Sequence, residues 1–144
     1  MHDDHPLAQD LGFLLSRASG VFAKTASEAL APLGLRVRSY SVLAFASDEK
    51  AGVTQRRLAE LVGLDPSQVV ALVDELEASG LVKRVTDPTD RRSKLVSATT
   101  KGSRVRDEGG RRIAEAQGGI MADVSPATRA ELNALLRQLV FPKG

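Results

Sequence analysis

The segment 54–80 constrains the fold more than any other part of the chain, because it encodes two short helices with a tight turn between them. Thr54 is a favourable N-cap for the first helix, and Gly63 predicts its end. Asp65, followed by a proline and then by a glutamine at the third helical position, predicts a capped start for the second helix. Small Ala59 allows a steep crossing, which is helix-turn-helix spacing. An ordinary helical hairpin remains the alternative at this point.

The hydrophobic period changes after Gly80 from helical to that of a hairpin. Leu81 and Val82 form one apolar pair, and Leu95 and Val96 form another, with a polar, proline-containing segment between them. A basic two-stranded ribbon directly after the second helix is the layout of a winged helix, and it disfavours the plain helical hairpin. A solvated charged hairpin is the alternative for the ribbon alone.

The second helix has the residue types of a helix that reads double-stranded DNA in the major groove. Ser67 and Gln68 can hydrogen-bond to base edges or phosphates, and Val70 and Ala71 can contact thymine methyl groups. Helix capping alone is the alternative for the first two. Acidic residues follow at 74 and 75, so we expect only the first two turns to approach DNA closely.

The hairpin carries five basic residues between positions 83 and 94. Those at the turn can place a guanidinium in the negative minor groove, with Asp90 orienting an arginine. Those on the strands are expected to contact phosphates and to make binding depend on salt. Surface ion pairing without DNA contact is the alternative. The turn residues are Arg91 and Arg92, and the strand residues are Lys83, Arg84 and Lys94.

Helical patterns flank this region on both sides, within a chain of 144 residues that is the size of one domain. We expect a long helix from Leu7 to Leu30, another over about 36–47, and one from Thr100 that extends to Val124. Ser125 caps a last helix. The glycine pairs 109–110 and 118–119 either permit a close helix crossing or mark bends.

Several function classes are excluded or disfavoured by composition. The chain has no cysteine, which excludes disulfides and thiolate metal sites, and its two histidines both lie within the first five residues. We therefore expect no enzyme, cofactor or metal site. Charged residues interrupt the first thirty positions, so we expect no signal peptide or membrane span and a cytoplasmic protein.

The residues of the ribbon resemble the wing signature of the MarR family of multiple-antibiotic-resistance-type regulators. That signature consists of an aspartate, an arginine, two aliphatic residues, a threonine and a glycine. The segment LDPSQVVALVDELEASGLV at 64–82 also resembles the family, and the resemblance is residue-specific from about 36 to 102. Ala98 departs from the usual leucine. The matching residues are Asp90, Arg92, Val96, Ala98, Thr99 and Gly102.

This resemblance implies a mainly α fold with a small β-wing, as a single domain over 1–144 with winged helix-turn-helix region 36–99. It implies that Arg92 enters the minor groove, braced by Asp90. It also implies a homodimer through helices in 7–31 and 100–142, and hence an inverted-repeat operator with half-sites about 34–36 Å apart. The alternative interpretation is that the leucines near both ends pack into a core within one chain: Leu11, Leu14, Leu132, Leu136 and Leu139.

Similarity to the family also implies a small aromatic or phenolic effector, which would relieve repression by favouring one of two states. Phe13, Phe22 and Tyr40 can line its cavity, or they can simply belong to the core. The expected function is a DNA-binding repressor. The alternative is a winged-helix protein-interaction module that binds no specific DNA sequence.

Overall fold

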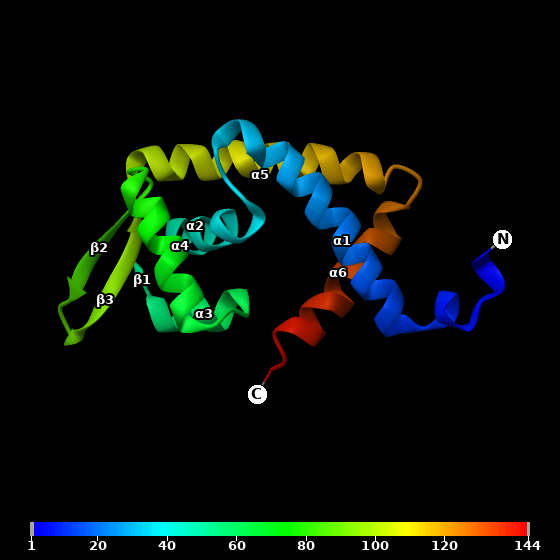
Figure 1. Cartoon of the computed structure of the whole chain (residues 1–144), viewed down its shortest axis with the longest axis horizontal. Helices are drawn as coiled ribbons and strands as arrows, with labels where there is room; N and C mark the ends of the chain where they lie inside the picture. Colours follow the sequence, from blue (N-terminus) through cyan, green and yellow to red (C-terminus); the bar gives the residue numbers. More distant parts are fainter. Residues whose placement is uncertain (1, 144) are drawn as a thin grey trace.

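The molecule is built along one long helix, α5, which links a winged region at one end to α1 and α6 at the other (Figure 1). The computed structural model describes residues 2–143. The predicted fold class is confirmed: the chain is mostly helical, with one small antiparallel sheet. The elements are η1 (His2–Asp4), η2 (Pro6–Gln9), α1 (Leu11–Leu30), η3 (Ala31–Leu33), α2 (Val37–Asp48), β1 (Val53–Thr54), α3 (Gln55–Val62), α4 (Pro66–Ala78), β2 (Val82–Asp87), β3 (Asp90–Ala98), α5 (Thr100–Ile120) and α6 (Pro126–Val140).

The hydrophobic core lies in the winged region, between α2, α3, α4 and the sheet. Each helix contributes the apolar residues that its period places on one face, which removes them from water. The end of α1 joins this core through Leu30. The largest fully buried side chains are Leu30, Leu43, Leu58, Val42, Val69, Val73 and Val96.

The sheet has three strands in the order β1-β3-β2, whereas the sequence predicted only the two strands of the hairpin. The additional strand, β1, pairs Val53 with Val96 and Thr54 with Leu95. Two residues are too few for a period-2 pattern to be visible in the sequence. This strand ties the start of α3 to the base of the hairpin.

The first long helix begins later than predicted. Residues Pro6–Gln9 form a 3₁₀ turn, and α1 starts at Leu11 because Asp10 is its N-cap. The Asp10 carboxylate accepts a hydrogen bond from the Phe13 N–H at 2.7 Å, and its extended backbone interrupts the helical path. The apolar spacing continues through this break, which is why periodicity alone overextends the helix.

Helix α5 ends at Ile120, so the expectation that it continues to Val124 was wrong. Ser125 caps α6 and needs an extended backbone, which the helix cannot supply. The glycine pair 109–110 permits a close crossing, because a Cβ at Gly109 would lie 3.0 Å from the Tyr40 ring. The pair 118–119 faces open space within the described chain.

The base of the wing meets α5 at an unusually close backbone contact. Thr99 donates from its N–H to the Leu81 carbonyl at 3.0 Å and from its hydroxyl to the Gly80 carbonyl at 2.6 Å. The same hydroxyl accepts from the Gly102 N–H at 3.0 Å. Buried Gly102 sits directly on the Leu81 carbonyl, where any Cβ would overlap it.

Apolar side chains of α1 and α6 are left uncovered by the chain itself. No residue of α6 within the described range is buried, and Leu139 is 61% exposed. On α1, Leu11 and Leu14 are also exposed. An intramolecular core therefore does not account for these leucines. Among the described residues, no helix is long and apolar enough to cross a membrane.

We predict that Gly102→Ala destabilises the protein by about 1–3 kcal/mol, because the added methyl group must displace the Leu81 backbone. At matched chain concentration the melting temperature should fall by about 2–4 °C per kcal/mol. Gly118→Ala is the control, since it meets open space and gains helix propensity. Equal melting temperatures for Gly102→Ala and the wild type would contradict the contact.

Candidate nucleic-acid interface

Helices α3 and α4 form the predicted helix-turn-helix. Thr54 caps α3 by accepting from the Arg57 N–H at 3.0 Å. Gly63 ends the helix with φ +69° and donates to the Ala59 carbonyl at 2.9 Å. Ala59 is buried, as the steep crossing requires, and Val69 of α4 fills the angle between the helices with no exposed surface. The sequence prediction for this crossing is confirmed.

The start of α4 is fixed by the predicted capping box. The Asp65 N–H donates to Gln68 Oε1 at 3.1 Å, and the Gln68 N–H donates to the Asp65 carbonyl at 3.0 Å. The Gln68 amide group keeps its two N–H donors for other partners. Ser67 and Ala71 are exposed one turn apart, with Val70 exposed beside them. The structure thus brings all four predicted α4 residues to one accessible end of the helix.

The wing is irregular where its two arginines lie. Thr86 pairs with Lys94 and Asp87 pairs with Asp90, so the three residues 91–93 of β3 have no partner on β2. Arg91 and Arg92 are both exposed there. The register shift interrupts the ladder at this part of the strand, where both arginines are open to solvent.

Two aspartates shape the wing tip. Asp90 Oδ1 accepts from the Arg92 N–H at 3.0 Å, so the contact between these two residues is made through the Arg92 backbone. Asp87 accepts from the N–H and the hydroxyl of Thr89 at 2.9 and 2.7 Å. These bonds from Thr89 lower the pKa of the Asp87 carboxyl, because they stabilise its charged form.

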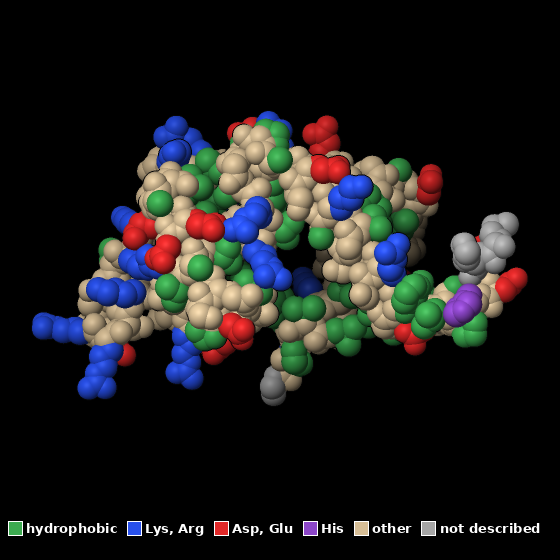
Figure 2. Space-filling model, in the orientation of Figure 1, with side chains coloured by type: hydrophobic (Ala, Val, Ile, Leu, Met, Phe, Trp, Pro, Cys, Tyr) green, Lys and Arg blue, Asp and Glu red, His purple; other side chains and the backbone are tan. Residues whose placement is uncertain are grey.

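The other basic residues of the hairpin fall into two groups. Lys83 is exposed, and Lys94 is exposed while donating to Thr86 Oγ1 at 2.9 Å. Arg84 differs, because its side chain is only 19% exposed and points to the carboxylates of Asp74 and Glu77. Figure 2 shows Lys and Arg side chains projecting from the end of the molecule that carries the wing.

The acidic residues of α4 are paired, which the sequence did not reveal. Asp74 and Glu77 share the Arg84 guanidinium, and Glu75 pairs with Arg36 of the segment before α2 at 2.7 Å. The expectation that residues 74 and 75 hold the later turns away from DNA assumed unpaired charges. Only the three-dimensional arrangement supplies these partners, since Arg36 lies 39 residues from Glu75.

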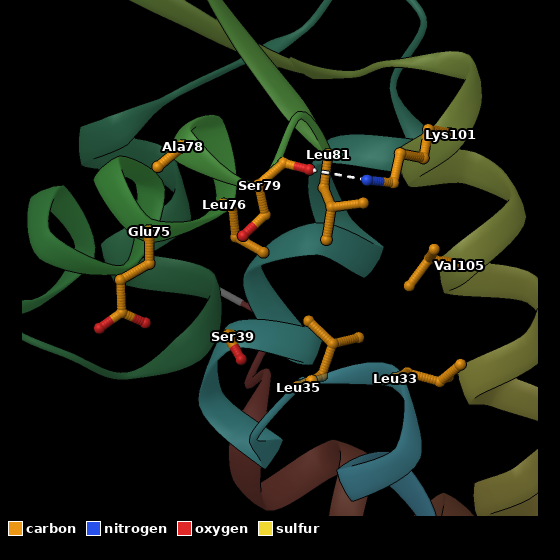
Figure 3. Close-up of a pocket in the computed structure, with 11 residues that line it drawn as sticks. Leu33, Leu35, Ser39, Glu75, Leu76, Ala78, Ser79, Leu81, Lys101 and Val105 are labelled. Carbon is orange, nitrogen blue, oxygen red and sulfur yellow. Dashed lines mark hydrogen bonds between the residues drawn. The ribbon is translucent and has the colours of Figure 1, made fainter.

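A cavity of about 490 Å³ lies between the end of α4, the start of α5 and the turn before α2 (Figure 3). Its lining is mostly apolar, with Lys101 at one end donating to the Ser79 carbonyl at 3.1 Å. The predicted ligand residues do not line it. Phe13 is exposed on α1, Phe22 is half-buried on the same helix, and Tyr40 packs against α5.

Comparison with known proteins gives agreement over nearly the whole chain. Residues 33–93 match the sequence profile of the MarR family. A protein named as a transcriptional regulatory protein for the hcr operon of Thauera aromatica is 30% identical over 134 residues, covering 92% of this chain and 80% of that protein.

Solved structures agree in fold over the same length. A MarR family transcriptional regulator from Rhodococcus sp. RHA1 is 45% identical, with a TM-score of 0.93 and coverage of 97% of this chain and 99% of that one. CouR from Rhodococcus jostii RHA1, bound to p-coumaroyl-CoA, is 42% identical, with a TM-score of 0.90 and coverage of 98% and 99%.

A transcriptional repressor CouR bound to a 23-mer DNA duplex is 27% identical, with a TM-score of 0.85 and coverage of 94% and 95%. These similarities extend through the capped helix α4, the arginine-bearing wing and the terminal helices. The chain belongs to the MarR family of DNA-binding transcriptional regulators.

Proposed function

We propose that this chain is a homodimeric repressor that occupies an inverted-repeat operator, with residues 36–99 as the DNA-binding region. The observation that carries the proposal is the position of α4 and the wing, which lie side by side at one end of the molecule (Figure 1). A helix start and an adjoining basic ribbon fit a major groove and the neighbouring minor groove. The role is regulatory and not catalytic, in the cytoplasm, where bacterial DNA lies.

In this proposal each exposed group has a distinct role. Ser67 and Gln68 hydrogen-bond to base edges or phosphates, while Val70 and Ala71 contact thymine methyl groups. Arg92, with Arg91 beside it, enters the minor groove, and Asp90 holds the backbone that presents it. The exposed cations Lys83 and Lys94 contact phosphates, which position the protein without reading sequence.

The dimer forms through residues 7–31 and 100–142. None of the described residues of α6 is buried by the rest of the chain. Apolar side chains of α1 and α6 are exposed to solvent, and such a surface is typical of an interface. A second copy supplies the same two faces, so a twofold interface buries both at once. The resulting pair of α4 helices explains why an inverted repeat is the expected operator.

The effector in this proposal is an aromatic acyl compound, because the similar protein CouR is solved with p-coumaroyl-CoA. Phe13, Phe22 and Tyr40 are proposed to line its site, which the second copy would complete. An effector that binds better to the DNA-free arrangement of the two α4 helices releases the operator. The cavity beside Lys101 is the competing location.

Selection of bound duplexes from a random DNA pool tests the function directly, and it should enrich an inverted repeat. On the selected duplex, Arg92→Ala should weaken binding at least about tenfold, since each of the dimer's two copies loses a contact that contributes about 1–3 kcal/mol. Fluorescence anisotropy measures the affinities. Arg112→Ala is the control, because Arg112 pairs with Glu108 on α5, away from the wing. No enrichment of any duplex favours the protein-interaction alternative.

We predict that Leu135→Glu combined with Leu139→Glu dissociates the dimer, because two carboxylates cannot be buried in an apolar interface. Analytical ultracentrifugation should then give the mass of one chain, and affinity for the inverted repeat should fall steeply. Ala130→Glu, on the opposite face of α6, should leave the dimer intact. A wild-type chain that sediments as a monomer would refute the proposed assembly.

Titration with p-coumaroyl-CoA should release the wild-type protein from its operator. Phe22→Ala should weaken effector binding, measured by calorimetry without DNA. Ala78→Phe, which fills the cavity at the end of α4, should leave that binding unchanged. If only Ala78→Phe abolishes binding, the effector site is the cavity and the assignment of the aromatic residues is wrong.

A further inference from the structure

Arg84 is held by acceptors from two helices, although it belongs to the wing strand β2. Its Nη2 donates to Asp74 Oδ1 at 2.6 Å and to the Val70 carbonyl at 3.3 Å, and its Nη1 donates to Glu77 Oε1 at 3.1 Å. Its Nε donates to Gln55 Oε1 of α3 at 2.9 Å. The guanidinium therefore touches α3 and α4 while its backbone lies in β2.

These contacts leave Arg84 little capacity for a phosphate. The guanidinium carries five N–H donors, and hydrogen bonds to four acceptors occupy most of them. Two carboxylates oppose its single positive charge, so the cluster has no excess positive charge to attract DNA. The Arg84 backbone N–H also donates to Glu77 Oε2 at 3.2 Å, which ties strand as well as side chain to α4.

We infer that Arg84 is a positioning residue that fixes the wing relative to α4 and neutralises the acidic part of that helix, and not a phosphate ligand. The inference rests on the proposed DNA binding, and it replaces the phosphate contact that the sequence predicted for this residue. The planar geometry of the guanidinium matters more than its charge, because it satisfies four acceptors on two helices at fixed angles.

Fixing the wing in advance favours specific binding over non-specific binding. An operator engages α4 and the wing tip together, so a loose wing must be ordered at the moment of binding. Non-specific DNA needs only phosphate contacts, which a mobile wing still makes. Loss of the Arg84 guanidinium contacts should therefore lower the ratio of operator affinity to random-duplex affinity.

Arg84→Lys distinguishes the two roles. Lysine can bind a phosphate through its single charge, but it lacks the planar set of N–H donors with which Arg84 reaches α3 and α4. We expect at least tenfold weaker operator binding, unchanged binding to a random duplex, and an unchanged slope of log K against log salt concentration. Lys83→Ala is the comparison, and it should weaken binding to both duplexes alike and reduce that slope by about two, about one for each copy in the dimer. Operator affinity of Arg84→Lys equal to the wild type would overturn the inference.

A second variant tests the same role from the opposite side. Asp74→Asn combined with Glu77→Gln keeps Arg84 but removes its charged partners. The inference predicts a lower ratio of operator affinity to random-duplex affinity. A phosphate ligand would instead be freed, which would keep or raise operator affinity and steepen the salt slope. This double variant distinguishes a positioning role from a phosphate contact even if Arg84→Lys fails to fold.

The wild type separates this inference from the proposed function. A wild-type chain that enriches no duplex refutes DNA binding itself, and the positioning role falls with it. The positioning role alone is refuted if the wild type binds its operator while Arg84→Lys and the double variant of Asp74 and Glu77 both give the results expected of a phosphate ligand.

Discussion

The contact of Gly102 with the Leu81 carbonyl is the constraint on which the arrangement of this molecule depends. It brings the first turn of α5 against the base of the wing, and Thr99 closes the junction with bonds to Leu81, Gly80 and Gly102. These are the threonine and the glycine of the wing signature. Their role here is structural, since they set the direction in which α5 leaves the winged region.

The regions at the two ends of α5 differ in how much of their apolar surface is buried. At one end, the winged region buries its own core, and its wing carries exposed basic side chains. At the other, α1 and α6 leave apolar faces that one chain does not cover. In the proposed dimer, α5 would connect the interface between the copies to each winged region. The spacing of the two α4 helices would then depend on that interface, and an effector bound there would change it.

Local signals in the sequence predicted the features that depend on local chemistry. The capping box at Asp65 located α4 because its bonds lie within four residues, and the change of period after Gly80 located the wing. The start of α1 and the end of α5 were misplaced, because the apolar spacing continues through the cap at Asp10 and through the turn 121–124 before Ser125. The partners of Arg84 could not be predicted, since they belong to α3 and α4 and lie up to 29 residues away in the sequence.

The unpaired stretch 91–93 of the wing has a consequence of its own. A strand without a ladder partner can slide or tilt with little loss of hydrogen bonding, whereas the base of the same strand is anchored on both sides by β1 and β2. The hairpin is therefore held firmly at its base and only loosely near its tip. If the wing enters a DNA groove as proposed, a tip free of ladder bonds would adjust to grooves of different width, and DNA sequences of differing shape would fit the same fold.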